Sequence, residues 1–224
     1  MKRFLPIAII VIVLLAAIAG GWILLRSSQQ SRKSANPTPD PALAVQGAEP
    51  PHIRGNPNAP VTVEEFGDFQ CPSCGVYYPE LKKIEAEFGD RLRVVFREYP
   101  LLPMHEHALI AAQVAEAAGL QGKFWEMHDK LYRNQKDWSE AGDPLPWFIA
   151  YAKELGLKID QFTSDLQSNQ IDQRIMTDIQ RGTSLGVTGT PTVFLDSHLV
   201  RYEATNAEGL RRGINILLEQ KAGS

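Results

Sequence analysis

Hydrophobic and polar positions divide the chain into three stretches. Residues 4–25 are uncharged and almost entirely apolar, whereas residues 26 to about 51 are polar and rich in Ser, Gln, Pro and Ala. The remainder combines short apolar runs with helically spaced apolar positions, the pattern of a domain with a buried core. The chain is therefore expected to contain a hydrophobic segment at 1–26, a flexible linker at 27–52 and one globular domain at 53–224.

The N-terminal segment is long enough to cross a membrane. Lys2 and Arg3 precede 22 uncharged residues, and at about 1.5 Å per residue such a helix matches a hydrocarbon core about 30 Å thick. Ala17-Ile18-Ala19 also fits a signal-peptide cleavage site, so cleavage near Ala19 and secretion is the alternative. The apolar run continues to Leu25, which favours an uncleaved transmembrane signal anchor. Both interpretations place the domain outside the cytoplasm, in the periplasm or at the cell surface.

The globular part begins with a strand–helix–strand pattern. β-branched and aromatic residues predict strands at 61–66 and 92–98. Between them, four residues recur at helical spacing: Tyr77, Leu81, Ile84 and Phe88. A helix is therefore expected to begin near Cys71, in a right-handed crossover between parallel strands.

A long helical region follows. Its expected helices cover residues 105–118, 122–134, 145–155, 159–168 and 171–185. Strand character returns at 192–195 and 198–202, and a last amphipathic helix has Asn206 as its expected N-cap. The predicted fold class is α/β, with a strand–helix–strand unit, a helical insertion, and a hairpin and helix that complete the sheet.

Charge is unevenly distributed along the chain. The whole chain has a formal net charge of -3, and residues 53–224 contain 18 Lys or Arg against 24 Asp or Glu. A net acidic domain without a basic patch argues against a nucleic-acid partner held through phosphate contacts.

The two cysteines of the chain form the sequence Cys71-Pro72-Ser73-Cys74. This spacing occurs in zinc sites, in short structural disulfides and in redox-active pairs. A structural zinc site requires four ligands and a second pair is missing, so no metal is expected. His105, His107 and His128 are interpreted as ordinary polar surface residues. A structural disulfide across so short a loop would contribute only roughly 2 kcal/mol, which favours the redox interpretation.

The redox interpretation uses the spacing directly. At the start of a helix, the Cys71 sulfur would meet unpaired backbone N–H groups and the positive end of the helix dipole, which favour a nucleophilic thiolate. Cys74 lies one turn further on the same face, where it can displace a bound thiol or re-form the internal disulfide. Pro72 suits the first helical turn. Ser73 brings no positive charge, so less thiolate stabilisation is expected than a histidine would provide.

Two further features fit this chemistry. Glu65 lies six positions before Cys71 on a predicted strand, where a carboxylate could accept and return the Cys74 proton. Of the neighbours Glu64 and Glu65, one should face solvent, and Glu65 is expected to be the inward one. Thr190-Pro191 opens a later strand, but about 5–6% of X-Pro bonds are cis, so the sequence alone does not predict a cis bond there.

Three segments in combination resemble the DsbA-like branch of the thioredoxin superfamily. They read VTVEEFGDFQCPSC (Val61–Cys74), GKFWEMHD (Gly122–Asp129) and GVTGTPT (Gly186–Thr192). The resemblance spans about residues 56–220 and implies a thioredoxin core split by a helical insertion at about 103–185.

The resemblance also assigns site residues. It implies an attacking role for Cys71, a resolving role for Cys74, a proton-relay position for Glu65 and a cis Thr190-Pro191 bond facing the cysteines. Pro72 and Ser73 then shape the site, and the Thr190 backbone can pair with an extended client segment by strand addition.

The implied function is oxidation of cysteine pairs in unfolded exported proteins, with no cofactor besides the Cys71–Cys74 disulfide. A quinone-linked membrane partner is expected to regenerate that disulfide. Residues 26–52 are too polar for a dimerisation module, so a monomer is expected. Strong oxidants of this family typically have histidine where this chain has Ser73. Whether the pair oxidises or reduces its clients is therefore left open. A disulfide reductase or isomerase is one alternative, and a tethered holdase or binding module is another.

Overall fold

The computed structural model describes residues 44–102 and 104–223. The predicted anchor at 1–26 and most of the predicted linker lie outside these residues. In the described part of the chain, no helix is both long enough and apolar enough to cross a membrane.

A mixed sheet of five strands forms the centre of the described domain, in the order β1-β3-β2-β4-β5. β2 and β3 are parallel, and the other neighbouring pairs are antiparallel. The strands are β1 (His52–Gly55), β2 (Val61–Gly67), β3 (Leu92–Glu98), β4 (Thr192–Leu195) and β5 (His198–Leu199). The predicted parallel unit is confirmed, since α2 (Pro72–Phe88) connects β2 to β3.

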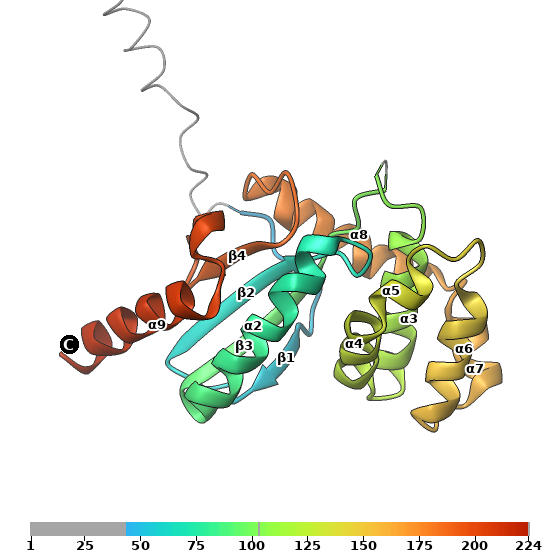
Figure 1. The fold of residues 1–224 in the computed structure, drawn as a ribbon, viewed down its shortest axis with the longest axis horizontal. Helices are drawn as coiled ribbons and strands as arrows, with labels where there is room; N and C mark the ends of the chain where they lie inside the picture. The colour runs from blue at the N-terminus through green and yellow to red at the C-terminus, as the bar shows by residue number, and fades with distance from the viewer. Residues whose placement is uncertain (1–43, 103, 224) are drawn as a thin grey trace, which may run out of the picture. The chain divides into compact units, whose positions relative to one another are not determined.

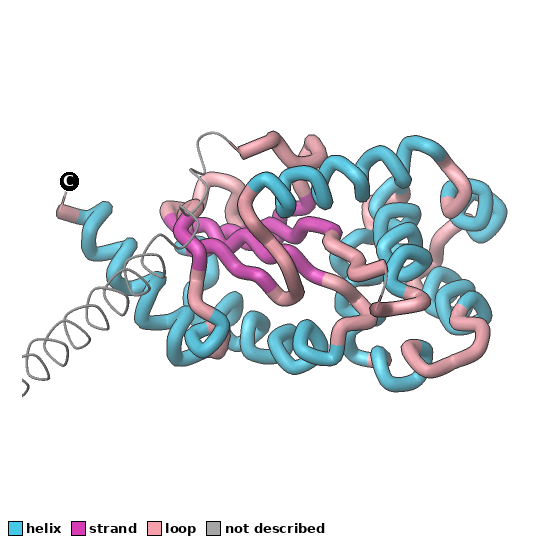
Figure 2. Tube along the Cα trace, turned by 90° about the horizontal axis from the view of Figure 1, so that it is seen from above, coloured by secondary structure: helices cyan, strands magenta, loops and turns pink. Residues whose placement is uncertain are grey.

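The helical insertion lies between β3 and β4, as predicted. Figure 1 shows α3 to α7 gathered at one end of the sheet, and Figure 2 shows helices on both faces of the strands. The insertion consists of α3 (Ala108–Leu120), α4 (Phe124–Arg133), α5 (Gln135–Trp138), α6 (Leu145–Glu154), α7 (Ile159–Asp165) and α8 (Asn169–Ser184). α9 (Ala207–Ala222) follows β5, and short 3-10 turns occur at η2 (Gly89–Arg91) and η3 (Tyr202–Ala204). Asn206 is the N-cap of α9, as predicted, because its side chain accepts the Gly209 N–H at 3.0 Å.

The two larger hydrophobic clusters among the described residues hold most of these layers together. One joins α2 and α9 to one face of the sheet through Leu81, Ile84, Leu210 and Ile214. The other fills the insertion and extends to both cysteines, with Trp138 among its fully buried side chains. The cysteine pair therefore lies where the core of the insertion meets the thioredoxin core.

Three local features differ from the predicted elements. β1 was not predicted, because its four residues contain one aliphatic side chain, Ile53, and form an edge strand. α5 lies between the helices expected at 122–134 and 145–155 and was not predicted, since four residues give no measurable periodicity. The strand expected at 198–202 ends at Leu199, since the exposed hairpin turns into η3.

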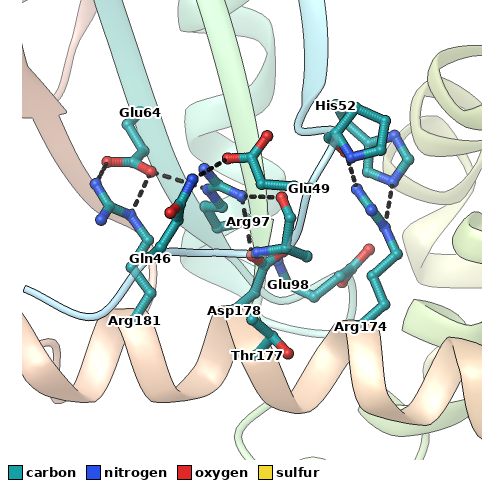
Figure 3. Close-up of polar contacts among 12 residues, drawn as sticks. Gln46, Glu49, His52, Glu64, Arg97, Glu98, Arg174, Thr177, Asp178 and Arg181 are labelled. Carbon is teal, nitrogen blue, oxygen red and sulfur yellow. Dashed lines mark hydrogen bonds and ion pairs between the residues drawn. The ribbon is translucent and has the colours of Figure 1, made fainter.

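Residues 44–51 also differ from the flexible linker expected there. The Ala48 N–H donates to the Asp178 carboxylate at 2.8 Å, and Arg97 donates to the Ala48 carbonyl at 2.8 Å. Arg181 donates to the Val45 carbonyl at 3.1 Å. Figure 3 shows the surrounding network between α8 and the sheet. The segment is held through its backbone by buried charged side chains, and the apolar pattern of the segment itself gives no sign of these partners.

Candidate active site

Cys71 is the N-cap of α2, and Pro72 is the first residue of the helix. The Cys71 backbone is extended, and its carbonyl accepts the Gly75 N–H at 3.1 Å, which begins the helical hydrogen-bond pattern. Proline fits here because the first helical N–H groups have no partner within the helix. The predicted placement of Cys71 at a helix start is confirmed.

The surroundings of Cys71 stabilise its thiolate. The pKa of Cys71 is lowered to about 5, chiefly by a hydrogen bond from the Cys74 thiol and further by the Thr190 side chain and the N–H groups of Cys74 and Ser73. Partial burial opposes this shift. The Cys71 sulfur lies 3.3 Å from the Thr190 carbonyl oxygen, and the residue is 6% exposed. The lowered pKa favours the thiolate form of Cys71 at neutral pH, in which the sulfur no longer donates to that carbonyl.

Cys74 has the opposite character. It is fully buried, and burial first and the neighbouring Cys71 sulfur second raise its pKa well above the ordinary value. The two cysteines are not joined in this structure. One sulfur is therefore set up to attack and the other to hold its proton until the exchange requires it.

Glu65 lies on β2 with 1% of its surface exposed. The pKa of Glu65 is raised to about 8, chiefly by burial, with Arg54 opposing the shift and the Glu85 carboxylate adding to it. The Glu65 carboxylate also raises the pKa of Cys74. A carboxyl group that titrates near neutral pH and interacts with Cys74 can exchange a proton with it, so the geometry is compatible with the predicted relay.

Glu64 does not face solvent, contrary to the expected alternation. It is 8% exposed and accepts hydrogen bonds from Arg97 at 2.9 Å and from Arg181 at 2.8 Å (Figure 3). The alternation of side chains holds, but α8 and residues 44–51 cover this part of the second face, so both glutamates are buried.

The Thr190-Pro191 peptide bond is cis, as the family resemblance implied. The Thr190 hydroxyl is buried and has no other hydrogen-bond partner among the described residues. Beside it lies a hollow of about 330 Å³, lined by residues 188–192 and 199–202. The predicted site residues are therefore brought together from β2, the first turn of α2 and the loop before β4.

The histidines are not ordinary surface residues. His105 lies 2.7 Å from the buried Asp68 carboxylate, and His107 lies 2.6 Å from the Ala141 carbonyl oxygen. His128 is buried among aromatic rings, and burial lowers its pKa to about 4. Within residues 44–102 and 104–223, no three Cys, His, Asp or Glu side chains are grouped so that they could hold a metal ion.

The loop before Cys71 depends on residues that sequence reasoning missed. The Asp68 side chain accepts the N–H groups of Gln70 at 2.8 Å and Leu101 at 2.9 Å. Gln135 donates to the Phe69 carbonyl at 2.7 Å and to the Cys71 carbonyl at 2.9 Å. Asp68, within the recognised segment, could have been suspected as a loop-forming residue, whereas nothing in the sequence marks Gln135.

A family model described as thioredoxin matches residues 48–215, which is most of the chain. The chain belongs to the thioredoxin family.

Solved structures define the branch of this family. DsbA2 from Pseudomonas aeruginosa is 28% identical, with a TM-score of 0.61 over 77% of this chain and 97% of that one. A thioredoxin-like oxidoreductase from Silicibacter pomeroyi DSS-3 is 25% identical, with a TM-score of 0.62 over 78% and 93%. BdbD from Bacillus subtilis, in its oxidised form, shares the fold, with a TM-score of 0.67 and 24% identity over 79% and 98%. The chain has the DsbA-like fold of thiol-disulfide oxidoreductases.

Curated relatives carry a different name. A Na(+)/H(+) antiporter NhaA 1 from Salinispora arenicola (strain CNS-205) is 41% identical over 145 residues, which are 65% of this chain and 21% of that protein. One from Mycolicibacterium gilvum (strain PYR-GCK) is 34% identical over 186 residues, 80% of this chain and 28% of that protein. The chain thus spans less than a third of the length of these relatives, and their name describes proteins of which this domain is one part.

Proposed function

We propose that this protein is a thiol-disulfide oxidoreductase that oxidises cysteine pairs of exported proteins through the Cys71–Cys74 disulfide. One observation carries the proposal: the Cys71 sulfur lies at the start of α2, beside Thr190, with a pKa lowered to about 5. The buried Cys74 adds a resolving thiol, and the buried Glu65 adds a carboxyl group that can exchange a proton with it.

The exchange can be written with all atoms and electrons balanced. A client thiolate attacks the Cys71 sulfur of the disulfide and releases Cys74, which takes a proton from Glu65. A second client thiolate then attacks the client sulfur in the mixed disulfide and releases Cys71 as a thiolate. The client loses two electrons and gains a disulfide, and the Cys71–Cys74 pair gains both electrons.

The ionisation of Cys71 favours the oxidising direction. A stabilised thiolate lowers the free energy of the reduced enzyme, so the disulfide form accepts electrons more readily. The low pKa is achieved with Ser73, because the Cys74 thiol, the Thr190 side chain and backbone N–H groups act on the Cys71 sulfur. The absence of histidine at position 73 therefore does not by itself favour the reductase or isomerase alternative.

Client access is supported by the surroundings of the pair. Val76 on α2 is 72% exposed, and Leu199 and Tyr202 beyond the cis-proline loop are also exposed. Exposed apolar side chains around a reactive sulfur suit unfolded chains, and the Thr190 backbone can pair with an extended client segment. A holdase or binding module would use the same surface but would not require ionised Cys71.

The cellular setting is part of the proposal. Residues 1–26 have the length and composition of a membrane anchor, with cleavage near Ala19 and secretion as the alternative. An anchored, monomeric domain outside the cytoplasm would meet exported clients and a quinone-linked membrane partner that reoxidises the pair. Sodium/proton exchange is not proposed, because the antiporter relatives match over less than a third of their length.

Turnover of a reduced, unfolded model protein with two thiols tests the proposal. The Cys71→Ser variant should lose client oxidation entirely. The Cys74→Ser variant, mixed with a client that already carries a disulfide, should accumulate a mixed disulfide through Cys71, because no second thiol of the enzyme can release it. Ala86→Ser, an exposed change in the second half of the same helix, is the control for non-specific effects. Unchanged client oxidation by Cys71→Ser would disprove the proposal, and client binding without exchange by the unaltered protein would favour a binding module.

A further inference from the structure

The short helix α5 touches the backbone of the redox site. From Gln135, the first residue of α5, the side-chain Nε2 donates to the Phe69 carbonyl at 2.7 Å and to the Cys71 carbonyl at 2.9 Å. An amide nitrogen carries two hydrogens, so these two acceptors use its full donor capacity. A side chain of the insertion therefore binds the main chain of the reactive cysteine.

The amide of Gln135 is also confined by the first turn of α2. A Cβ atom added at Gly75 would lie 2.3 Å from Gln135 Oε1 and 3.0 Å from its Cδ. Any side chain at position 75 would have to push the amide away from the two carbonyls. The glycine thus leaves the space in which the amide reaches Cys71.

A second contact joins the same loop to the insertion. The Gln70 side chain donates to the Ser139 carbonyl at 2.8 Å and accepts the His107 N–H at 2.6 Å. The backbone from Phe69 to Cys71 is thus held from the helical side by two glutamines. The sulfur at the end of this loop has little freedom to move relative to the insertion.

The Cys71 carbonyl has a defined role in the helix start. It accepts the Gly75 N–H at 3.1 Å as well as the Gln135 amide. The direction of this carbonyl fixes the first turn, and the N–H groups of Ser73 and Cys74 in that turn act on the Cys71 sulfur. A group that holds the carbonyl therefore also holds the donors that face the sulfur.

We propose that Gln135 is a positioning residue, through which the helical insertion holds the Cys71 backbone so that the first-turn N–H groups of α2 face the Cys71 sulfur. A neutral amide suits this position, because a carboxylate there would repel both carbonyl oxygens and the thiolate. The inference rests on the proposed function for its relevance to catalysis, but its physical content concerns the ionisation of Cys71.

Titration of the Cys71 thiolate by ultraviolet absorbance is the first test. Gln135→Met keeps the length of the side chain and removes both donors, so the ratio of thiolate to thiol at a fixed pH should fall by roughly 2- to 10-fold, the range expected for loss of one or two hydrogen bonds. The equilibrium constant with glutathione should shift toward the disulfide form by a similar factor. Gln135→Ala gives a second variant if the methionine side chain perturbs folding.

Lys136→Ala on the same helix is the matched control, because Lys136 is exposed. It should leave the Cys71 titration and the glutathione equilibrium unchanged. Equal titration curves for Gln135→Met, Gln135→Ala and the unaltered protein, with all three folded by circular dichroism, would overturn the proposal.

The contact with Gly75 provides a second, independent test. Gly75→Ala, made with Gln135 present, should displace the Gln135 amide and reduce ionisation of Cys71. The same change in a Gln135→Ala background should have little further effect, since the displaced group is already missing. Additive effects of the two changes would contradict the proposed contact.

The two proposals fail in different ways. If Gln135→Met alters the Cys71 titration while the unaltered protein oxidises no client, the positioning role stands and the proposed function is wrong. If clients are oxidised and the Gln135 substitutions leave the Cys71 titration unchanged, the positioning role is wrong and the proposed function stands.

Discussion

The Cys71 sulfur lies 3.3 Å from the carbonyl oxygen of Thr190, a residue 119 positions later in the chain. The sheet produces this contact, because β2 leads into Cys71, β4 follows Thr190, and Phe66 pairs with Thr192 across the two strands. The reactive sulfur and the proposed client-binding backbone are therefore fixed by neighbouring strands. A client segment paired with Thr190 would have its own sulfur beside Cys71.

The protonation of the two thiols predicts how the reduction potential varies with pH. Cys71 has a pKa of about 5 and Cys74 one well above the ordinary value, so reduction between these values takes up one proton for two electrons. One proton per two electrons corresponds to about 30 mV per pH unit, against about 59 mV for two protons. Measurement of the potential between about pH 6 and about pH 7.5 should give the smaller slope. A slope near the larger value would show that Cys71 is protonated at neutral pH.

The raised pKa of Glu65 predicts how the stability of the folded protein depends on pH. This pKa is raised from 4.5 to about 8 in the folded protein, so the unfolded chain releases its proton at lower pH than the folded one. Stability is therefore lost as pH rises from about 4.5 to about 8, by at most about 1.4 kcal/mol per pH unit. Glu65→Gln removes this penalty, and denaturant unfolding at pH 8 should find the variant more stable by a few kcal/mol, with little difference near pH 4.5.

The same variant should slow the exchange. Without a carboxyl group at position 65, Cys74 lacks the group that gives it a proton near neutral pH, so the step in which a client thiolate opens the Cys71–Cys74 disulfide and releases Cys74 should slow by ~100-fold or more. Stopped-flow measurement of that step gives the rate. Glu219→Gln, which changes an exposed residue of α9, is a control that should leave the rate unchanged. A Glu65→Gln rate equal to that of the unaltered protein would exclude the relay.

The contacts of Asp178 predict that residues 44–51 contribute to the stability of the folded protein. The Asp178 carboxylate is fully buried, accepts the Ala48 N–H at 2.8 Å and lies 3.1 Å from Arg97. Asp178→Ala would leave Arg97 with less compensation for its buried charge, and loss of one partner of such a pair costs about 3–5 kcal/mol. Chemical denaturation should show this loss. Arg212→Ala, which breaks an exposed pair with Glu208, should cost less than about 1 kcal/mol. Equal costs for the two variants would mean that residues 44–51 are not held as described.

The sequence predicted those parts of the fold that depend on local pattern. The bounds of β3 and β4 are as expected, and α2 begins at the Cys71–Pro72 step, because periodic burial and proline chemistry act over a few residues. β1 was missed because an edge strand of four residues needs no apolar alternation. Glu64 was misjudged because its cover comes from α8, more than 100 residues away.

In the candidate site too, local sequence pattern predicted some features, and contacts between distant residues, which the pattern does not show, set the others. The cysteine spacing and the position of Pro72 were sufficient to predict a nucleophile at a helix start. The cis Thr190-Pro191 bond required the family resemblance, since a single X-Pro step is seldom cis. Gln135 was not predicted, because its contacts with Phe69 and Cys71 join residues more than 60 positions apart and follow no periodic pattern.

The equilibrium between the Cys71–Cys74 pair and a glutathione buffer at pH 7 tests the account most directly. A stabilised Cys71 thiolate predicts an oxidising pair, with a potential closer to about -120 mV than to about -270 mV. A potential near about -270 mV would mark the pair as a reductant and contradict the proposed direction. A pair that fails to exchange with glutathione at all would contradict the redox role itself.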